Sequence, residues 1–90
     1  MRRMLFFGAS WCGPCKAVKR IYIDNIMEEC FEQVYMIDLD DHPHYAHDLR
    51  ITRIPTIVFI DDEKTQSFCD NYPKIENAIA WLKGETDDFD

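Results

Sequence analysis

The stretch Trp11-Cys12-Gly13-Pro14-Cys15 decides the fold of this chain. Before it, the apolar run of residues 4–7 predicts a buried strand, and residues 8–10 form a loop of small residues. After it, residues 16–29 predict a helix with a one-sided apolar stripe. This order places Cys12 at the helix N-cap and Cys15 in the first turn. Residues three apart share one helix face, so the two sulfurs come within reach of a disulfide.

The chemistry of this stretch follows from its place at a helix start. Free N–H groups and the positive end of the helix dipole stabilise a thiolate at Cys12, and the thiolate is the nucleophile. Cys15 lies one turn in, so we expect it to be more buried and to resolve the mixed disulfide that Cys12 forms. Pro14 is tolerated near a helix start because its missing N–H would have no partner there. Gly13 keeps a side chain off the sulfur, and Trp11 offers a partner a flat apolar surface.

The alternative interpretations of the cysteine pair are a zinc site and a purely structural disulfide. Zinc needs four ligands, and Cys30 and Cys69 do not form a second close pair. We therefore expect these two cysteines to be reduced packing or edge residues. His44 and His47 lie three apart on a short predicted helix, but a solvated helix start explains them better than a metal site. We expect no metal and no cofactor beyond the redox-active Cys12–Cys15 pair.

Trp11 to Lys16 resembles the active site of the thioredoxin family. Arg53-Ile54-Pro55-Thr56 resembles that family's second signature. The resemblance implies a cis bond before Pro55 and a loop that faces the cysteines, in which the backbone of Ile54 hydrogen-bonds an extended substrate segment. Asn71 is the closest match to the glycine that this family places at the third wall of the groove. The implied substrate-binding residues are Trp11, Gly13, Pro14, Ile54, Pro55 and Asn71.

The resemblance also organises the rest of the chain. We expect an α/β protein with a minimal thioredoxin fold in the order β-α-β-α-β-β-α, a central four-stranded mixed sheet flanked by helices. The expected strands are residues 3–7, 34–39, 56–60 and 65–69, and the expected helices are 12–29, 43–49 and one opened by Pro73. Residues 1–84 form a single domain, and residues 85–90 form an acidic C-terminal tail that we expect to be frayed. In size and layout the chain resembles a glutaredoxin, without the extra strand and helix that a full thioredoxin places in front.

Three positions depart from the thioredoxin pattern. Phe6 and Met36 stand where thioredoxins bury an aspartate and its lysine partner, so the usual proton acceptor for the resolving thiol is replaced. Arg20 stands in place of a mid-helix proline, and we expect a less kinked helix. Asp38 points to the same strand face as Met36 and lies nearer the cysteines, which makes it a candidate general base. The alternative is that Asp38 marks the solvated end of the strand and that bulk water takes the proton.

The charge distribution separates the two ends of the chain. The net charge of −7 argues against nucleic acid as a partner. Residues 1–20 carry five Lys or Arg residues and no acid, so the field near Cys12 is positive on an acidic protein. An ordinary solvated helix face explains this cluster equally well. No apolar run is long enough to span a membrane, and we expect an unprocessed, cytoplasmic monomer.

These observations predict an enzyme, a thiol–disulfide oxidoreductase that reduces disulfides of protein substrates. Thioredoxin reductase is the expected electron source. The alternative enzyme is a glutaredoxin-like oxidoreductase that uses glutathione as its electron donor. In that case the carboxylate of Asp70 can accept a hydrogen bond from the glutathione amine. A redox-inert binding module on the same fold is the non-enzyme alternative, which the two intact cysteines disfavour.

Overall fold

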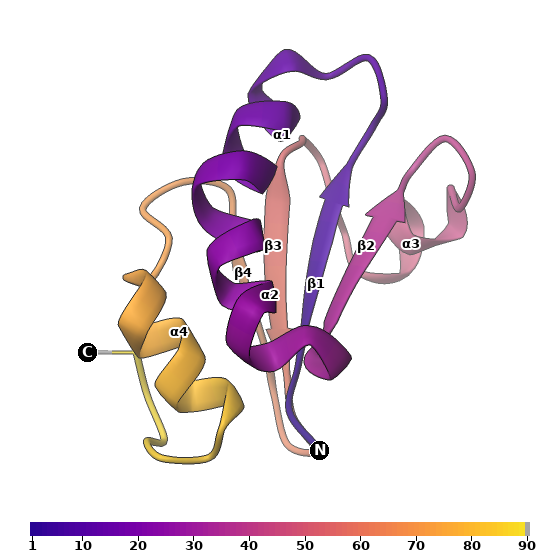
Figure 1. The fold of residues 1–90 in the computed structure, drawn as a ribbon. Coiled ribbons are helices and arrows are strands. Elements are labelled where there is room, and N and C mark those ends of the chain that lie inside the picture. Colours follow the sequence, from indigo (N-terminus) through magenta and orange to yellow (C-terminus); the bar gives the residue numbers. More distant parts are fainter. Residues whose placement is uncertain (90) are drawn as a thin grey trace.

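The computed structural model describes residues 1–89 as one four-stranded sheet with helices on both faces (Figure 1). The strands are β1 (Arg3–Gly8), β2 (Val34–Asp38), β3 (Thr56–Ile60) and β4 (Thr65–Phe68), in the order β2-β1-β3-β4. β2 runs parallel to β1, whereas β3 is antiparallel to both β1 and β4. The predicted fold class and the predicted order of strands along the chain are confirmed, with strand ends within one residue of the prediction.

One continuous helical segment covers the front of the sheet in Figure 1. It consists of α1 (Gly13–Val18), the π-helical turn η1 (Lys19–Ile23) and α2 (Asp24–Cys30). A 3-10 turn, η2 (Phe31–Gln33), leads into β2. Arg20 lies inside the π-helical turn, and the expectation of a less kinked helix than one with proline stays a prediction. Such turns are a recognised cause of helix irregularity without proline.

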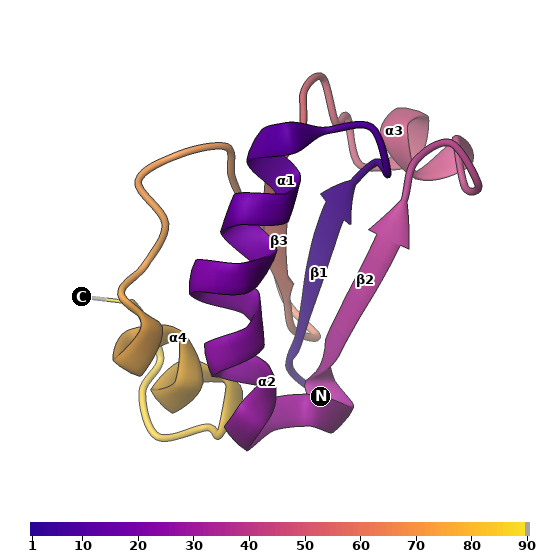
Figure 2. The same cartoon turned by 45° about the horizontal axis from the view of Figure 1, so that its top comes forward.

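The other two helices lie on opposite sides of the sheet. α4 (Ile75–Leu82) packs beside α2 on the front face, and α3 (His44–Asp48) lies behind the carboxyl ends of β1 and β2 (Figure 2). Pro73 precedes α4 rather than opening it, since Lys74 is the residue at its N-cap. Gly84 follows α4 with a φ of +79°, the left-handed conformation expected just past a helix end.

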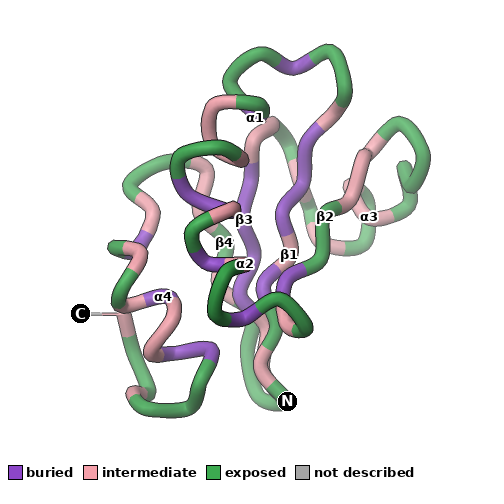
Figure 3. Tube along the Cα trace, in the orientation of Figure 1, coloured by how far each residue is buried: buried purple, intermediate pink, exposed green. Residues whose placement is uncertain are grey.

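The core lies between the central strands and the front helices. β1 and β3 are buried along most of their length, whereas β2, at the sheet edge, is buried only at Val34 and is exposed or half-buried beyond it (Figure 3). Trp81 of α4 is fully buried and meets Phe59 of β3 edge to face, with ring centroids 5.6 Å apart. Within residues 1–89, Trp81 is the largest fully buried side chain.

The C-terminal segment folds back onto this core as far as residue 89. Phe89 packs its ring against Phe59 and Trp81, with centroid distances of 4.6 and 5.2 Å. The guanidinium of Arg2 donates to the carbonyl oxygens of Trp81 and Thr86 and lies over the Trp81 ring, 4.7 Å from its centroid. The predicted frayed tail is therefore wrong for residues 85–89, because an aromatic anchor and an arginine clamp hold this segment. Residue 90 lies outside the described residues.

Candidate functional site

The two predicted catalytic cysteines, Cys12 and Cys15, are joined by a disulfide at the start of α1. Their Cα atoms are 5.3 Å apart, a usual separation for a disulfide. Cys12 is the N-cap residue, its N–H donates to the Ala9 oxygen, and its Sγ accepts the Cys15 N–H at 3.2 Å. Cys12 is 5% and Cys15 4% exposed, so the expected difference in burial is not found in the disulfide form. Pro14 occupies the first turn, as predicted.

Gly8, the last residue of β1, lies against the buried cysteine. A Cβ atom at Gly8 would stand 3.2 Å from both Cβ and Sγ of Cys15. Such contacts are tighter than side chains normally make, so glycine lets the strand and the dithiol helix approach this closely. Gly13 is different, because a Cβ there would meet nothing within 4 Å. This clearance leaves out the chain neighbours Cys12 and Pro14, so the role of Gly13 beside the Cys12 sulfur stays a prediction.

Trp11 is held beside the cysteines by a carboxylate that the sequence analysis did not identify. Its side chain is 70% exposed, and its indole N–H donates to Asp40 Oδ2 at 2.8 Å. Asp40 is in turn placed by Asp38, whose Oδ1 accepts the Asp40 N–H at 2.8 Å. The run of acids after β2 was the signal available in the sequence, but it did not reveal which acid reaches the tryptophan.

The second signature loop lies at the same end of the sheet as the cysteines. The Ile54–Pro55 bond is cis, as the resemblance implied. The loop leads directly into β3, whose first residue Thr56 is opposite Phe7 of β1, and Figure 1 shows the start of β3 close to the start of α1. The Thr56 hydroxyl donates to the Arg53 oxygen at 2.6 Å and so closes the loop. Ile54 packs on the core cluster that includes both Cys12 and Cys15.

Asn71 lies in the connection between β4 and α4. Its φ of +49° is the conformation that favours glycine, in keeping with its match to a family glycine. Tyr22 of η1 holds this connection, because its hydroxyl donates a hydrogen bond to the Pro73 oxygen. Burial raises the pKa of Tyr22, and the neighbouring Tyr72 raises it further. No contact in residues 1–89 joins Asn71 to the disulfide, so its substrate-binding role stays a prediction. Asp70 is paired with Arg53 at 3.5 Å.

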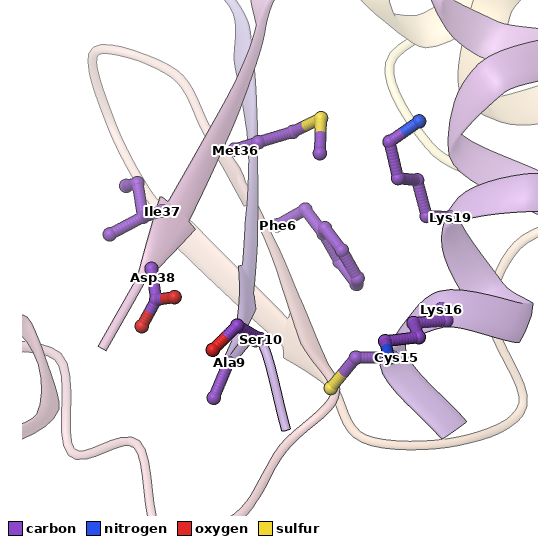
Figure 4. Close-up of a pocket in the computed structure, with 10 residues that line it drawn as sticks. Phe6, Ala9, Ser10, Cys15, Lys16, Lys19, Met36, Ile37 and Asp38 are labelled. Carbon is purple, nitrogen blue, oxygen red and sulfur yellow. The ribbon is translucent and has the colours of Figure 1, made fainter. Parts of the chain in front are cut away.

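A cavity of about 330 Å³ opens between the dithiol helix and the end of β2 (Figure 4). Phe6 and Met36 form its apolar floor, and Cys15 lies at one end. Asp38 lies across the cavity from the helix, which contributes Lys16 and Lys19 to the lining. Lys19 is engaged with Asp24 at 2.9 Å. Asp38 and Cys15 therefore share one cavity, and the role of Asp38 as general base stays a prediction.

The family model described as thioredoxin matches residues 2–83 of this chain. The chain belongs to the thioredoxin family. The chain is 45% identical over 87 residues to chloroplastic thioredoxin M3 of Oryza sativa subsp. japonica, covering 93% of this chain and 49% of that protein. It is 38% identical over 80 residues to thioredoxin H4-2 of the same species, covering 84% and 59%.

Solved thioredoxin structures agree with the architecture. The X-ray structure of Fasciola hepatica thioredoxin is 28% identical, with a TM-score of 0.74 over 90% of this chain and 80% of that one. The chain spans about half the length of the curated relative that it matches at 45% identity. The family and these relatives are thioredoxins, so the glutaredoxin alternative is not favoured.

The pair Phe6 and Met36, which departs from the thioredoxin pattern, sets the surroundings of Cys15. Phe6 is 5% exposed and belongs to the core cluster, whereas Met36 is 45% exposed at the sheet edge. An apolar pair here leaves no buried charge without a partner. The cavity beside Cys15 is consequently apolar on its floor and charged only at its rim.

The two remaining cysteines are free, as predicted. Cys30, the last residue of α2, is buried, and burial raises the pKa of its thiol. Cys69 is half-buried, and its Sγ lies 3.4 Å from the Thr56 hydroxyl. Across residues 1–89 there is no group of three or more His, Cys, Asp or Glu side chains placed to hold a metal. No helix in the same range has the length and apolar character to cross a membrane.

Proposed function

We propose that this chain is a thiol–disulfide oxidoreductase that reduces disulfides in protein substrates. The observation that carries the proposal is the Cys12–Cys15 disulfide at a helix start, beside the exposed Trp11 and the cis-Pro55 loop. Membership of the thioredoxin family supports it. Because the chain spans about half of its first relative, the activity, substrates and partners of the whole protein all belong to this proposal.

The reaction needs only the two cysteines and the backbone around them. The Cys12 thiolate attacks one sulfur of the substrate disulfide, so a Cys12–substrate disulfide forms and the other substrate sulfur leaves as a thiolate that takes up a proton. The Cys15 N–H, which lies 3.2 Å from Cys12 Sγ in the oxidised form, stabilises the attacking thiolate. Cys15 then loses its proton and attacks Cys12 Sγ. The second substrate thiol is released, and the Cys12–Cys15 disulfide carries the two-electron oxidation.

Substrate contacts fall on the surface around the exposed indole. Trp11 is fixed through Asp40, and the Ile54 backbone beside the cis bond offers hydrogen bonds to an extended segment. We assign thioredoxin reductase as the donor that returns two electrons to the oxidised pair. Reducing compartments keep such thiols active, and we place the protein in the cytoplasm as a monomer.

Insulin reduction separates the two enzyme alternatives. The protein is assayed once with NADPH and thioredoxin reductase and once with reduced glutathione, NADPH and glutathione reductase. We expect turnover with the first donor system and a rate at least about tenfold lower with the second, because the chain belongs to the thioredoxin family and its motifs match that family. Turnover with glutathione alone would favour the glutaredoxin-like enzyme, and inactivity with both donors would refute the oxidoreductase proposal.

A further inference from the structure

Arg53 lies directly before the residue whose backbone offers hydrogen bonds to a substrate. That residue, Ile54, packs on the core cluster that contains the two catalytic cysteines, and its bond to Pro55 is cis. The Arg53 oxygen accepts the Thr56 hydroxyl at 2.6 Å, which holds the backbone of Arg53 in the loop. The side chain of Arg53 is 63% exposed, so its positive charge lies at the surface beside the cis bond.

The connection from β4 to α4 brings a carboxylate to the same place. β3 and β4 are antiparallel, so the end of β4 lies beside the start of β3 (Figure 1). The Cys69 Sγ atom, just past β4, lies 3.4 Å from the Thr56 hydroxyl. One residue further on, the Asp70 Oδ2 atom lies 3.5 Å from the guanidinium of Arg53. The Arg53–Asp70 pair therefore joins two loops at the cysteine end of the sheet.

The ion pair between these two side chains is weak and open to exchange. No hydrogen bond joins the two side chains within residues 1–89, and both are more than half exposed. Asp70 also accepts a hydrogen bond from the Asn71 amide at 3.4 Å, whereas the Arg53 guanidinium donates none in the same range. Exposed ion pairs contribute little stability, so a better acceptor can displace Asp70. A carboxylate that approaches in the plane of the guanidinium accepts two hydrogen bonds from it.

The loop that carries Asp70 is fixed to the dithiol helix. Tyr22 of η1 donates its hydroxyl to the Pro73 oxygen, and its ring centroid lies 5.5 Å from that of Tyr72. The Tyr72 hydroxyl in turn donates to the Cys69 oxygen at 3.1 Å. Asp70 lies between these anchored residues, so the charged pair has a constant position relative to the cysteines. Selection of a substrate by charge requires such a fixed position.

The two charges of the pair are not equivalent for a bound substrate. Arg53 adjoins Ile54, whose backbone binds the extended segment, whereas Asp70 lies on the neighbouring loop. The long side chain of Arg53 therefore meets the residue beside the attacked cysteine before Asp70 does. An acidic residue there gains hydrogen bonds from the guanidinium, and a basic residue meets a like charge. Lys16, directly after Cys15, adds a positive charge that has no ion-pair partner within residues 1–89.

We propose that Arg53 selects protein substrates in which an acidic residue lies next to the disulfide-bonded cysteine. In the complex, the substrate carboxylate takes the place of Asp70 beside the guanidinium while the Ile54 backbone binds the segment. Arg53 is a specificity residue and takes no part in electron transfer, because the two electrons still pass from the Cys12–Cys15 dithiol to the substrate disulfide. This inference rests on the proposed oxidoreductase function and names the substrate class of that function.

The test uses three oxidised peptides of the form acetyl-Gly-X-Cys-Gly-Ser-Gly-Ser-Cys-X-Gly-amide with an internal disulfide, where X is glutamate, glutamine or lysine. Because X adjoins both cysteines, the attacked sulfur always has it as a neighbour. The full chain is reduced with dithiothreitol, freed of it and mixed with each peptide in a stopped-flow instrument, and tryptophan fluorescence follows oxidation of the dithiol. We expect the second-order rate constant for the glutamate peptide to be at least about tenfold above that for the lysine peptide at low salt. The glutamine peptide should fall between them, and the ratio should shrink at high salt.

Substitutions at one position assign the preference to Arg53. Arg53→Gln should bring the rate constants for the glutamate and lysine peptides within about twofold of each other, and Arg53→Glu should invert their order. Arg20→Gln is the matched control, because it removes the same charge from an exposed position on the helical segment that follows the cysteines, and it should keep the wild-type ratio. Circular dichroism confirms the fold of each variant, and the order of the three peptides in the wild type decides if a variant does not fold.

The outcomes separate this inference from the function on which it rests. Equal rate constants for the three peptides in the wild type, or a wild-type ratio in Arg53→Gln, would overturn the inference alone. A ratio lost in Arg20→Gln as well would assign the preference to the overall field of the protein and would also overturn it. No reaction with any of the three peptides would refute the proposed oxidoreductase function, and the inference with it.

Discussion

Gly8→Ala tests whether the close approach of β1 to the dithiol helix shapes the redox pair. The new Cβ would stand 3.2 Å from two atoms of Cys15 and 3.7 Å from the Phe6 ring. Cys15 is 4% exposed, so neither strand nor helix can move aside freely. Overpacking of this kind costs about 1–3 kcal/mol, and the lower entropy of the unfolded alanine chain offsets about 0.4–1 kcal/mol. We expect the oxidised form to lose about 1–2 kcal/mol of its free energy of unfolding.

The reduced form should suffer less from the same methyl group. Its Cys15 sulfur is released from Cys12 and can shift by the few tenths of an ångström that the contact demands. If that shift relieves half of the cost, the two forms differ by about 0.5–1 kcal/mol. For a two-electron couple, 1.4 kcal/mol corresponds to about 30 mV, so the reduction potential should rise by about 10–20 mV.

Two independent measurements check this prediction. Urea unfolding of the oxidised and reduced forms gives the stability change in each, and equilibration with glutathione gives the potential. The two must agree because they close one thermodynamic cycle. Gly13→Ala is the matched control for stability, since its Cβ meets nothing within 4 Å, and it should not be destabilised. An oxidised Gly8→Ala protein as stable as the wild type would refute the reasoning.

Three further predictions follow from named contacts. Phe89→Ala should lower the free energy of unfolding by about 1–3 kcal/mol, measured in urea, because its ring packs on Phe59 and Trp81; a change under about 0.5 kcal/mol would mean that the tail is not docked. Tyr22→Phe should cost about 1 kcal/mol at neutral pH by leaving the Pro73 oxygen unpaired. Burial raises the pKa of Tyr22 in the folded state above its unfolded value, so the wild type loses stability as the pH rises above about 10, whereas the variant does not. The difference in stability between the two proteins should therefore shrink above that pH. A difference that grows with pH in thermal melts would contradict this assignment. Asp38→Asn should slow resolution of the mixed disulfide by about tenfold if Asp38 takes the proton, whereas equal stopped-flow rates in the two proteins would assign the proton to bulk water.

The sequence predicted the dithiol helix and the order of strands and helices along the chain because both depend on local rules. A continuous apolar strand, a small loop and a helix start fix Cys12 and Cys15, and the cis bond before Pro55 followed from the second signature. The π-helical turn at Lys19–Ile23 could not be read from the helix pattern, because helical periodicity does not register one added residue.

The contacts that were missed join residues far apart in the chain. Asp40 accepts a hydrogen bond from Trp11, which lies 29 positions earlier in the chain. The ring of Phe89 packs against the ring of Phe59 in β3. An acidic tail predicts fraying by composition, and only the position of the Trp81 and Phe59 rings shows that Phe89 has a site to fill. Likewise, the value of glycine at position 8 depends on how near the helix passes, which no local pattern encodes.

Trapping the mixed disulfide tests the central claim, the division of labour between Cys12 and Cys15, most directly. Cys15→Ser and Cys12→Ser proteins are each incubated with oxidised insulin, quenched with acid and mapped by mass spectrometry. We expect the Cys15→Ser protein to accumulate an insulin chain bound through Cys12, because the resolving thiol is gone, and the Cys12→Ser protein to trap none above background. An adduct on Cys15 in the Cys12→Ser protein, with none on Cys12 in the other, would contradict the assigned roles.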